Sequence, residues 1–578
     1  MILKFVLMVF VALLGGCAHV GESDVAKVVE PIKTIAGVEK KAPEVEVKTV
    51  ESSQLDAALL YSLLGGEVAG QRGDVNMASA FYVDAAKRSN DPQVALRAAQ
   101  IALYNKDVVA AKSAIDILVA GGGLSLQSHR LALTVYLRSG DVEKSLSQIA
   151  SILEKSDIPQ RNALLAIGDI VSRNAAKEVA GKVMNALVDK YSAEAGVYLA
   201  RSQIMSHLGD FVQAEEDAIK VTKLDSSWPV GFAQLSLVLE HKGETERALV
   251  VLKSAVERLK ARPLMMGYGQ LLAKNEQYEE AREQFLMLVS QEESYPEASF
   301  ALGLVYLKLD NAAEATKIFN NLYEEKAFSS KSAFYLGRIH YYQKEYEDAL
   351  LWFERVSKGA HYIDSHASIA MIKSETGDLQ GARSVLQRLR NEYPKDSARF
   401  YLLEAELLME GQHNKLLYEL LTEAITESPD NLSLRYARSI AATELDELAI
   451  AEKDLLFVLE REPKDANALN ALGYTLANKT FRFKDARRYL TQALSLRPDD
   501  PAILDSMGWL NYREGNYEDA LTLLKRAYSK TPEGEIAAHL GETLWMLGRQ
   551  KEARELWEEG LRRDSDNRYL IEVLQRLK

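Results

Sequence analysis

The chain has almost no cysteine and little proline. Its 578 residues include one cysteine, Cys17, and 13 prolines. A single cysteine excludes an internal disulfide, a zinc site built from several cysteines and a CxxC redox pair. Proline makes up about 5% of ordinary proteins. Its scarcity here argues against a row of ordinary globular domains.

The chain also lacks an excess of positive charge and any familiar catalytic motif. Its 70 lysines and arginines are outnumbered by 83 aspartates and glutamates, for a net charge of −13. Nucleic-acid binding needs clustered lysine and arginine, so this balance does not favour it. The sequence contains no HExxH, GxSxG, GxxxxGK[ST] or GxGxxG motif. His361 and His366 do not share one helical face. We therefore expect a non-enzymatic protein without a metal or a cofactor.

The first sixteen residues have the pattern of a secretory signal peptide. Lys4 precedes an apolar run over residues 5–14, and the small residues Gly15 and Gly16 follow. A membrane-spanning helix needs roughly 20 apolar residues, so this run is too short for a permanent anchor. The string Leu14-Gly15-Gly16-Cys17 resembles the bacterial lipobox. The resemblance implies removal of residues 1–16 and lipidation of Cys17; a plain signal peptide with a chance cysteine is the alternative.

The residues after the cysteine predict a tether and a location. Residues 17–52 contain no Phe, Trp or Tyr and are rich in Val, Lys, Glu and Pro. A segment so poor in bulky apolar groups does not offset its ordering entropy, so we expect a flexible tether. Ala18 follows the cysteine where an aspartate would mark inner-membrane retention. By resemblance to Gram-negative lipoproteins, this favours the periplasmic face of the outer membrane.

From about residue 59 the sequence repeats every 33–35 residues. In the unit from Pro501 to Pro532, Gly508 is the eighth residue, and Ala520 and Leu524 follow a Gly-Asn turn. This pattern resembles the tetratricopeptide repeat (TPR). The resemblance implies an all-α, right-handed superhelix, or α-solenoid, of about 11–15 helix pairs over residues 55–566. Residues 567–578 are predicted to form a capping helix.

Each position of the repeat has a physical reason. We expect Gly508 to allow a close approach to Ala520 where the two helices cross, and Leu524 to fill the space between units. Pro532 ends the second helix because it has no N–H to donate. One pair cannot bury its own apolar face, so neighbouring pairs stack into a continuous core. Residues 156–195 have a helical pattern without the signature and are predicted to form a degenerate pair.

In TPR proteins the first helix of each pair lines a concave groove. The resemblance therefore implies which side chains face a partner. Four units give the following groove residues: Phe334, Arg338, Tyr341 and Tyr342; Asn467, Asn470, Tyr474 and Asn478; Asp505, Trp509, Tyr512 and Arg513; Glu535, Glu542, Trp545 and Met546. Aromatic rings beside amides and charges are typical of a protein-binding surface. Packing of Trp509 and Trp545 within the fold, and simple solvation of the asparagines, remain the alternatives.

The lipobox, the tether and the repeats together resemble the large TPR outer-membrane lipoproteins of proteobacteria. The strings Ala468–Tyr474, Asp505–Trp509 and Ala537–Gly541 contribute to this resemblance. One such lipoprotein is an adaptor that binds a periplasmic carboxyl-terminal processing protease and promotes its degradation of peptidoglycan hydrolases. The resemblance implies a scaffold with these protein partners. A scaffold for peptidoglycan synthesis or exopolysaccharide export, or an enzyme with an unrecognised site, remains open.

Overall fold

The structure is a computed structural model that describes residues 56–290 and 295–577. In these two ranges all the regular elements are helices, 31 α-helices and one short 3-10 helix. The described residues up to Asn311 form one compact unit, and those from Ala312 form a second. None of the described helices is long and apolar enough to cross a membrane.

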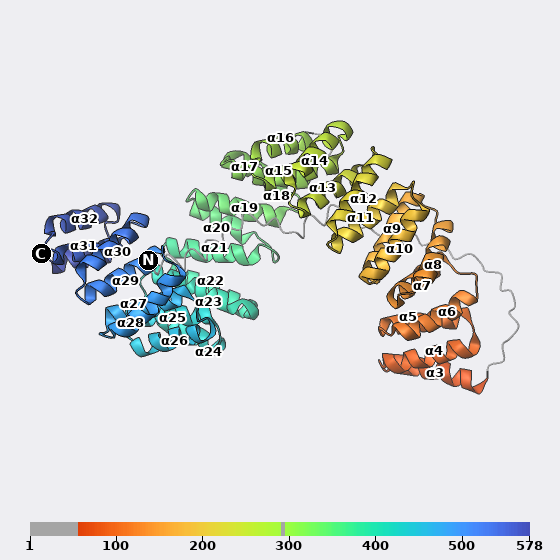
Figure 1. The fold of residues 1–578 in the computed structure, drawn as a ribbon, viewed down its shortest axis with the longest axis horizontal. Helices are drawn as coiled ribbons and strands as arrows, with labels where there is room; N and C mark the ends of the chain where they lie inside the picture. The colour runs from red at the N-terminus through yellow and green to blue at the C-terminus, as the bar shows by residue number, and fades with distance from the viewer. Residues whose placement is uncertain (1–55, 291–294, 578) are drawn as a thin grey trace. The chain divides into compact units, whose positions relative to one another are not determined.

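The first unit is a row of helix pairs that ends with a single helix (Figure 1). Its helices are α3 (Ala57–Gln71), α4 (Val75–Ser89), α5 (Pro92–Tyr104), α6 (Val108–Ala120), α7 (Leu126–Ser139), α8 (Val142–Glu154), α9 (Gln160–Asn174), α10 (Lys177–Lys190), α11 (Ala195–His207), α12 (Phe211–Leu224), α13 (Pro229–His241), α14 (Thr245–Leu259), α15 (Arg262–Lys274), α16 (Tyr278–Val289) and α17 (Pro296–Lys308).

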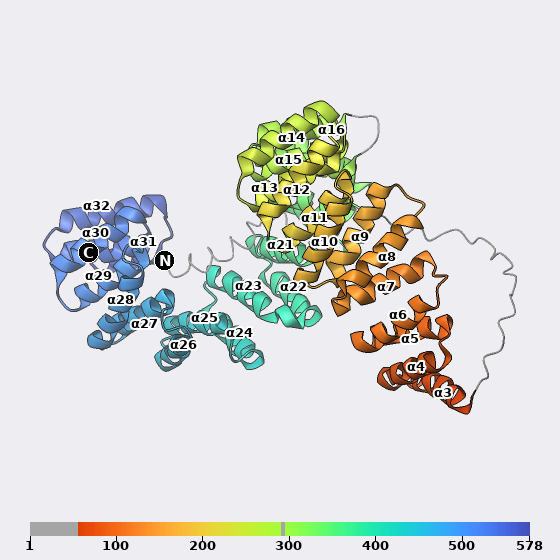
Figure 2. The same cartoon turned by 45° about the vertical axis from the view of Figure 1, so that its right-hand side comes forward.

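The second unit is also a row of helices, of which α21 to α32 are labelled in Figure 2. Its helices are α18 (Ala312–Tyr323), α19 (Ser329–Tyr342), α20 (Tyr346–Glu354), α21 (Tyr362–Glu375), α22 (Leu379–Glu392), η1 (Pro394–Asp396), α23 (Ser397–Glu410), α24 (Asn414–Glu427), α25 (Leu432–Glu444), α26 (Leu448–Arg461), α27 (Ala466–Lys479), α28 (Phe483–Leu496), α29 (Pro501–Arg513), α30 (Tyr517–Lys530), α31 (Gly534–Met546), α32 (Gln550–Arg563) and α33 (Arg568–Arg576).

The order of helices confirms the predicted all-α solenoid. The described helices α3 to α32 number thirty, which is fifteen pairs when counted by chain order alone, the upper end of the predicted range, and α33 follows them. Turn residues explain where the helices stop and start. Gly209 has a φ of 78°, which a glycine adopts without strain, and the next residue, Asp210, accepts a hydrogen bond from the N–H of Gln213 as the N-cap of α12.

The glycine at position eight has a different neighbour from the one predicted. A Cβ on Gly508 would lie 2.7 Å from Cγ of Leu524, whereas the sequence suggested Ala520 as the residue that needs the space. At Gly473 both neighbours are close: a Cβ would lie 2.5 Å from Cγ of Leu490 and 3.2 Å from the backbone oxygen of Ala486, the alanine at position 20. The glycine makes room for the large side chain at position 24, because that side chain lies over the first helix of its own pair.

The pair without the signature is also built differently. Helix α9 packs chiefly against α11 and only slightly against α10, its successor in the chain. Two glycines allow this approach: a Cβ on Gly168 would lie 2.5 Å from Cβ of Ala200, and a Cβ on Gly196 would lie 2.5 Å from the carbonyl oxygen of Arg161. Leu164 and Ile167 of α9 therefore share a core with residues of α11.

Candidate protein-binding face

Three first helices of the second unit carry most of the predicted groove residues. Helix α27 packs against α29, and α29 packs against α31. Their side chains meet in a network of rings and hydrogen bonds. We call Tyr474, Asn478, Trp509, Tyr512 and His539 the C-terminal face.

Trp509 is the centre of the C-terminal face. Its ring stacks on Tyr512 at 4.6 Å between centroids and on His539 at 4.0 Å. Its Nε1–H donates a hydrogen bond to the side-chain oxygen of Asn478 over 3.1 Å. Only 7% of Trp509 is exposed. The tryptophan is therefore held in one orientation by neighbours from all three helices, and most of its surface packs within the fold, which was the alternative left open by the sequence.

A buried ion pair lies beneath this ring. The Nδ1 atom of His539 lies 3.0 and 3.1 Å from the two carboxylate oxygens of Asp505. Burial alone would lower the pKa of His539, but the carboxylates of Asp505, Glu535 and Glu542 outweigh burial and raise that pKa. Burial likewise raises the pKa of Asp505, with His539 opposing it. The hydrogen bond between the two side chains fixes the imidazole against Trp509.

Tyrosine hydroxyls connect the C-terminal face to the last pair. Tyr474 donates to Glu535 over 2.8 Å, and Tyr512 donates to Glu542 over 3.1 Å. Glu542 also forms an ion pair with Arg576 of α33. The capping helix thus holds one of the predicted groove residues in place.

The three predicted asparagines of α27 have different surroundings. Asn467 accepts a hydrogen bond from Arg497 over 3.1 Å, and Asn478 accepts one from the indole N–H of Trp509. Asn470 is 5% exposed, and its side-chain oxygen has no hydrogen-bond partner among the described residues. A buried carbonyl oxygen without a donor costs free energy, so Asn470 is an unsatisfied group in the interior beside the C-terminal face.

Two of the remaining predicted residues of the last two pairs are held by neighbouring rings. Trp545 is half-buried and stacks on Trp557 at 5.9 Å between centroids. The guanidinium of Arg513 lies 5.7 Å from the ring of Phe483 and donates to the backbone oxygen of Asn478. Met546 is exposed.

The predicted residues of α19 form a separate group. Phe334 is buried and stacks on His361 at 4.5 Å, while Arg338 lies near the rings of Phe334 and Tyr342. Tyr341 donates to Glu375 over 2.7 Å. Tyr342 is 70% exposed. Among the described residues, no contact joins these side chains to the C-terminal face.

An acidic group, which was not predicted from the sequence, lies on two first helices that come between α19 and α27 in the chain. The group consists of Glu375 on α21 and of Glu406 and Glu410 on α23. Burial and the nearby charge of Glu410 raise the pKa of Glu406 to about 7. Burial and Glu375 raise the pKa of Glu410. Glu375 could have been found by counting repeat positions back from the turn at Gly377. Groove positions were assigned only in the repeats with the clearest pattern, and this repeat was not among them.

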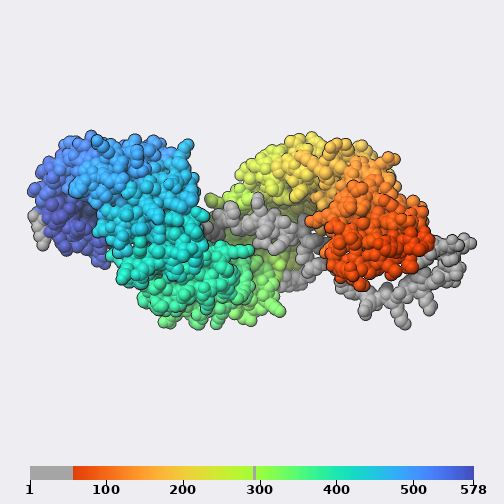
Figure 3. All heavy atoms as spheres, turned by 90° about the horizontal axis from the view of Figure 1, so that it is seen from below, coloured from red at the N-terminus to blue at the C-terminus, as the bar shows by residue number. Residues whose placement is uncertain are grey.

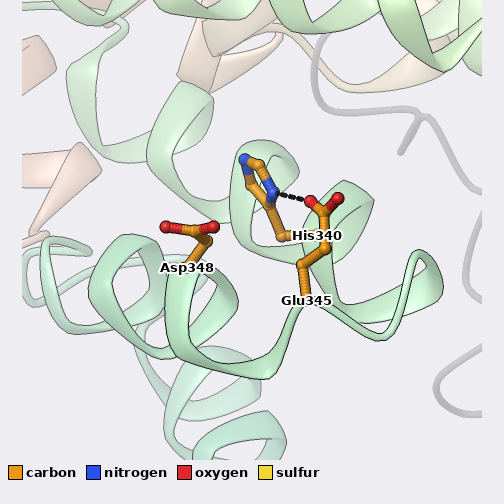
Figure 4. A group of neighbouring side chains, drawn as sticks. All are labelled: His340, Glu345 and Asp348. Atoms are coloured by element: carbon orange, nitrogen blue, oxygen red, sulfur yellow. Dashed lines mark hydrogen bonds and ion pairs between the residues drawn. The ribbon is translucent and has the colours of Figure 1, made fainter.

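One cluster of possible metal ligands lies at the turn between α19 and α20. His340, Glu345 and Asp348 place one ligand atom each within 4.8 Å of one another (Figure 4). The Nδ1 atom of His340 is bonded to Glu345 over 2.6 Å, and both carboxylates are exposed. The cluster therefore has the structure of a surface hydrogen bond between a histidine and a glutamate, with an aspartate nearby. The two histidines considered in the sequence have aromatic neighbours instead, Phe334 for His361 and Tyr362 for His366.

Comparison with known families identifies the repeat. The tetratricopeptide-repeat family matches residues 267–330, 300–360, 479–535 and 506–568, and a second model of the same repeat matches residues 368–396. Among solved structures, yeast Tom70 is 16% identical with a TM-score of 0.35, covering 72% of this chain and 93% of that one. The structure of Naa15/Naa10 bound to HypK-THB is 13% identical with a TM-score of 0.37, covering 90% and 89%.

Curated proteins provide a more extensive match. Superkiller protein 3 of Schizosaccharomyces pombe is 22% identical over 311 residues, which are 50% of this chain and 22% of that protein. A TPR repeat-containing protein of Pseudomonas aeruginosa is 31% identical over 517 residues, which are 87% of this chain and 85% of the relative. Since this identity extends over most of both proteins, the chain belongs to the TPR repeat-containing proteins.

Proposed function

We propose that this protein is a non-enzymatic scaffold that binds other proteins through the first helices of its second unit. The observation that carries the proposal is the fixed Trp509 ring, stacked between Tyr512 and His539. A side chain that is already ordered loses little entropy when a partner binds, so more of the contact energy appears as affinity. Tryptophan and tyrosine are also the residues most enriched at binding hot spots.

The polar groups beside the ring suit a peptide chain as ligand. The phenolic oxygens of Tyr474 and Tyr512, which donate to glutamates, keep acceptor capacity of their own. Such groups fix the register of a bound segment, while the aromatic surface supplies contact area.

For the partners we propose a periplasmic carboxyl-terminal processing protease and the peptidoglycan hydrolases that it degrades. The support is the resemblance to the protease-adaptor lipoproteins. Holding enzyme and substrate on one scaffold raises their effective concentration without any new chemistry.

We further propose that a lipid on Cys17 anchors the protein to the periplasmic face of the outer membrane. Cys17→Ser tests this anchor: the variant is expected to be lost from the membrane fraction. A variant that stays in the membrane fraction would contradict the proposal.

Binding of the purified protease to the full-length chain tests the scaffold. Calorimetry is expected to show a complex, and Trp509→Ala to weaken it by about tenfold or more, as for a hot-spot tryptophan. Tyr104→Ala is the matched control, because Tyr104 is an aromatic residue 79% exposed on α5 of the first unit. Equal affinity for wild type and a folded Trp509→Ala would contradict the proposed face.

The adaptor step has its own readout. Cleavage of a purified peptidoglycan hydrolase by the protease is expected to be faster when the scaffold is present. Cleavage that is equally fast without the scaffold, or cleavage by the scaffold alone, would contradict the adaptor function.

A further inference from the structure

Helix α3, the first described helix of the first unit, exposes an apolar stripe. Leu60, Leu64 and Val68 are 44%, 56% and 46% exposed. They are spaced by four residues and so lie on one helical face. Tyr61 extends the stripe. Figure 1 places α3 at the outer end of its row of helices, and Figure 3 shows the atoms of the first pairs at the surface.

The opposite side of α3 makes the ordinary contacts of the solenoid. Leu59 and Ala69 are buried. Gly66 lies against α4, where a Cβ would meet the ring of Tyr82 at 2.8 Å. The exposed stripe is thus additional to the face that packs on the next helix.

The stripe carries almost no charge, although the chain as a whole has a net charge of −13. Glu67 is the only charged residue within α3, and its carboxylate accepts a hydrogen bond from the hydroxyl of Tyr82. The helix at the end of the second unit differs, since α33 carries Arg568, Glu572 and Arg576. A solenoid end in water normally has such a polar outer face.

We propose that two copies of this chain associate through α3, antiparallel about a twofold axis at Leu64. Leu64 is the central residue of Ala57–Gln71. The axis therefore places Leu64 against Leu64 of the second copy and Leu60 against Val68 of the second copy. A twofold interface of this kind uses the same patch on both chains, which only a self-complementary surface permits.

The charges at the ends of α3 specify this orientation. Asp56 is the N-cap of the helix and Arg72 its C-cap. Both are exposed, and among the described residues Arg72 has no ion pair. Antiparallel pairing brings Asp56 of each copy close to Arg72 of the other. It also places the positive end of each helix dipole beside the negative end of the other, which is electrostatically favourable. Parallel pairing would instead place like charges together. The complementarity thus favours a second copy of the chain over a charged partner.

Sedimentation of the full-length protein in a Cys17→Ser background tests the pairing. A monomer–dimer equilibrium is expected, and Leu64→Glu is expected to raise its Kd by about tenfold or more, because two carboxylates would meet at the axis. Arg72→Asp is expected to weaken the dimer as well, since it would oppose Asp56. Val109→Glu is the matched control, a change of an apolar residue 82% exposed on α6 of the same unit. Circular dichroism confirms the fold of each variant.

Disulfide trapping gives an independent readout. In the Cys17→Ser background, Leu64→Cys is expected to give a crosslinked dimer on mild oxidation, because two cysteines at the axis come within bonding reach. Val109→Cys is expected to give no crosslinked dimer. A protein that stays monomeric at every concentration, a dimer unaffected by Leu64→Glu, or equal crosslinking at both positions would overturn the proposal. The test does not depend on the proposed function.

Discussion

At the scale of single residues, glycine at position eight decides how closely the two helices of a pair pack. Helix α15 contains a matched comparison. A Cβ on Gly269 would lie 2.7 Å from the ring of Phe285, whereas a Cβ on Gly267 would meet nothing within 4 Å. The two glycines are therefore expected to respond in opposite ways to the same substitution.

Gly269→Ala is expected to destabilise its pair by about 1–3 kcal/mol, the cost of overpacking a filled site. Gly267→Ala is expected to stabilise the same helix by about 0.5–1 kcal/mol, because alanine loses less backbone entropy. Native-state hydrogen exchange of α15 and α16 measures both effects. A stabilising Gly269→Ala would contradict the packing described above.

The raised pKa of Glu406 predicts a pH dependence of stability. Its folded pKa of about 7 lies above the ordinary value of 4.5. The fold therefore favours the protonated form, and this contribution is fully present below pH 4.5 and is lost as the pH rises through about 7. The free energy of unfolding of the wild-type protein is therefore expected to decrease as the pH rises from 4.5 to about 7, because Glu406 loses its proton over this range.

Urea unfolding of Glu406→Gln across the same pH window measures this contribution, and the variant is expected to lose that part of the slope. Glu410→Gln removes the neighbouring like charge and is expected to lower the upper end of the window, while the lower end near pH 4.5 is set by the unfolded chain. An unchanged slope in Glu406→Gln would show that the carboxyl is not perturbed.

At the scale of elements, α33 closes the apolar end of the second unit. Leu570 and Val573 are buried against the last pair, and a Cβ on Gly560 of α32 would lie 2.6 Å from Cδ1 of Leu570. Leu570→Ala is expected to cost about 2–5 kcal/mol, as in other buried sites. Ile571→Ala, at the exposed neighbouring position, is expected to change stability by less than about 0.5 kcal/mol.

Hydrogen exchange of α31 and α32 measures the effect of the two substitutions. Increased exchange should be confined to the last pairs, because a solenoid transmits stability mainly between neighbours. Equal effects of Leu570→Ala and Ile571→Ala would contradict the capping role.

Repeat periodicity was enough to predict the helices and their order, because glycine turns and position-eight glycines recur at fixed spacing. It was not enough to predict which helices pack in the irregular pair, since the approach of Gly168 to Ala200 depends on contacts between non-adjacent helices. The groove positions were likewise predicted from one repeat at a time. The bond from Tyr474 to Glu535, 61 residues apart, depends on how successive pairs stack.

At the scale of the whole molecule, the fold supplies many similar helix pairs and only a few distinctive surfaces. The fixed aromatic rings of the C-terminal face and the uncharged stripe of α3 lie in different units. The proposed scaffold therefore has one surface for other proteins and another for a second copy of itself.

Site-specific photocrosslinking in living cells tests the scaffold most directly. A photoreactive residue replaces Tyr474 on the C-terminal face or, as the control, Lys551 on α32, whose side chain is 90% exposed. The scaffold predicts covalent adducts at position 474 that contain the processing protease or a peptidoglycan hydrolase, and none of these at position 551. Adducts with those proteins at 551 alone, or no protein adduct at 474, would contradict it.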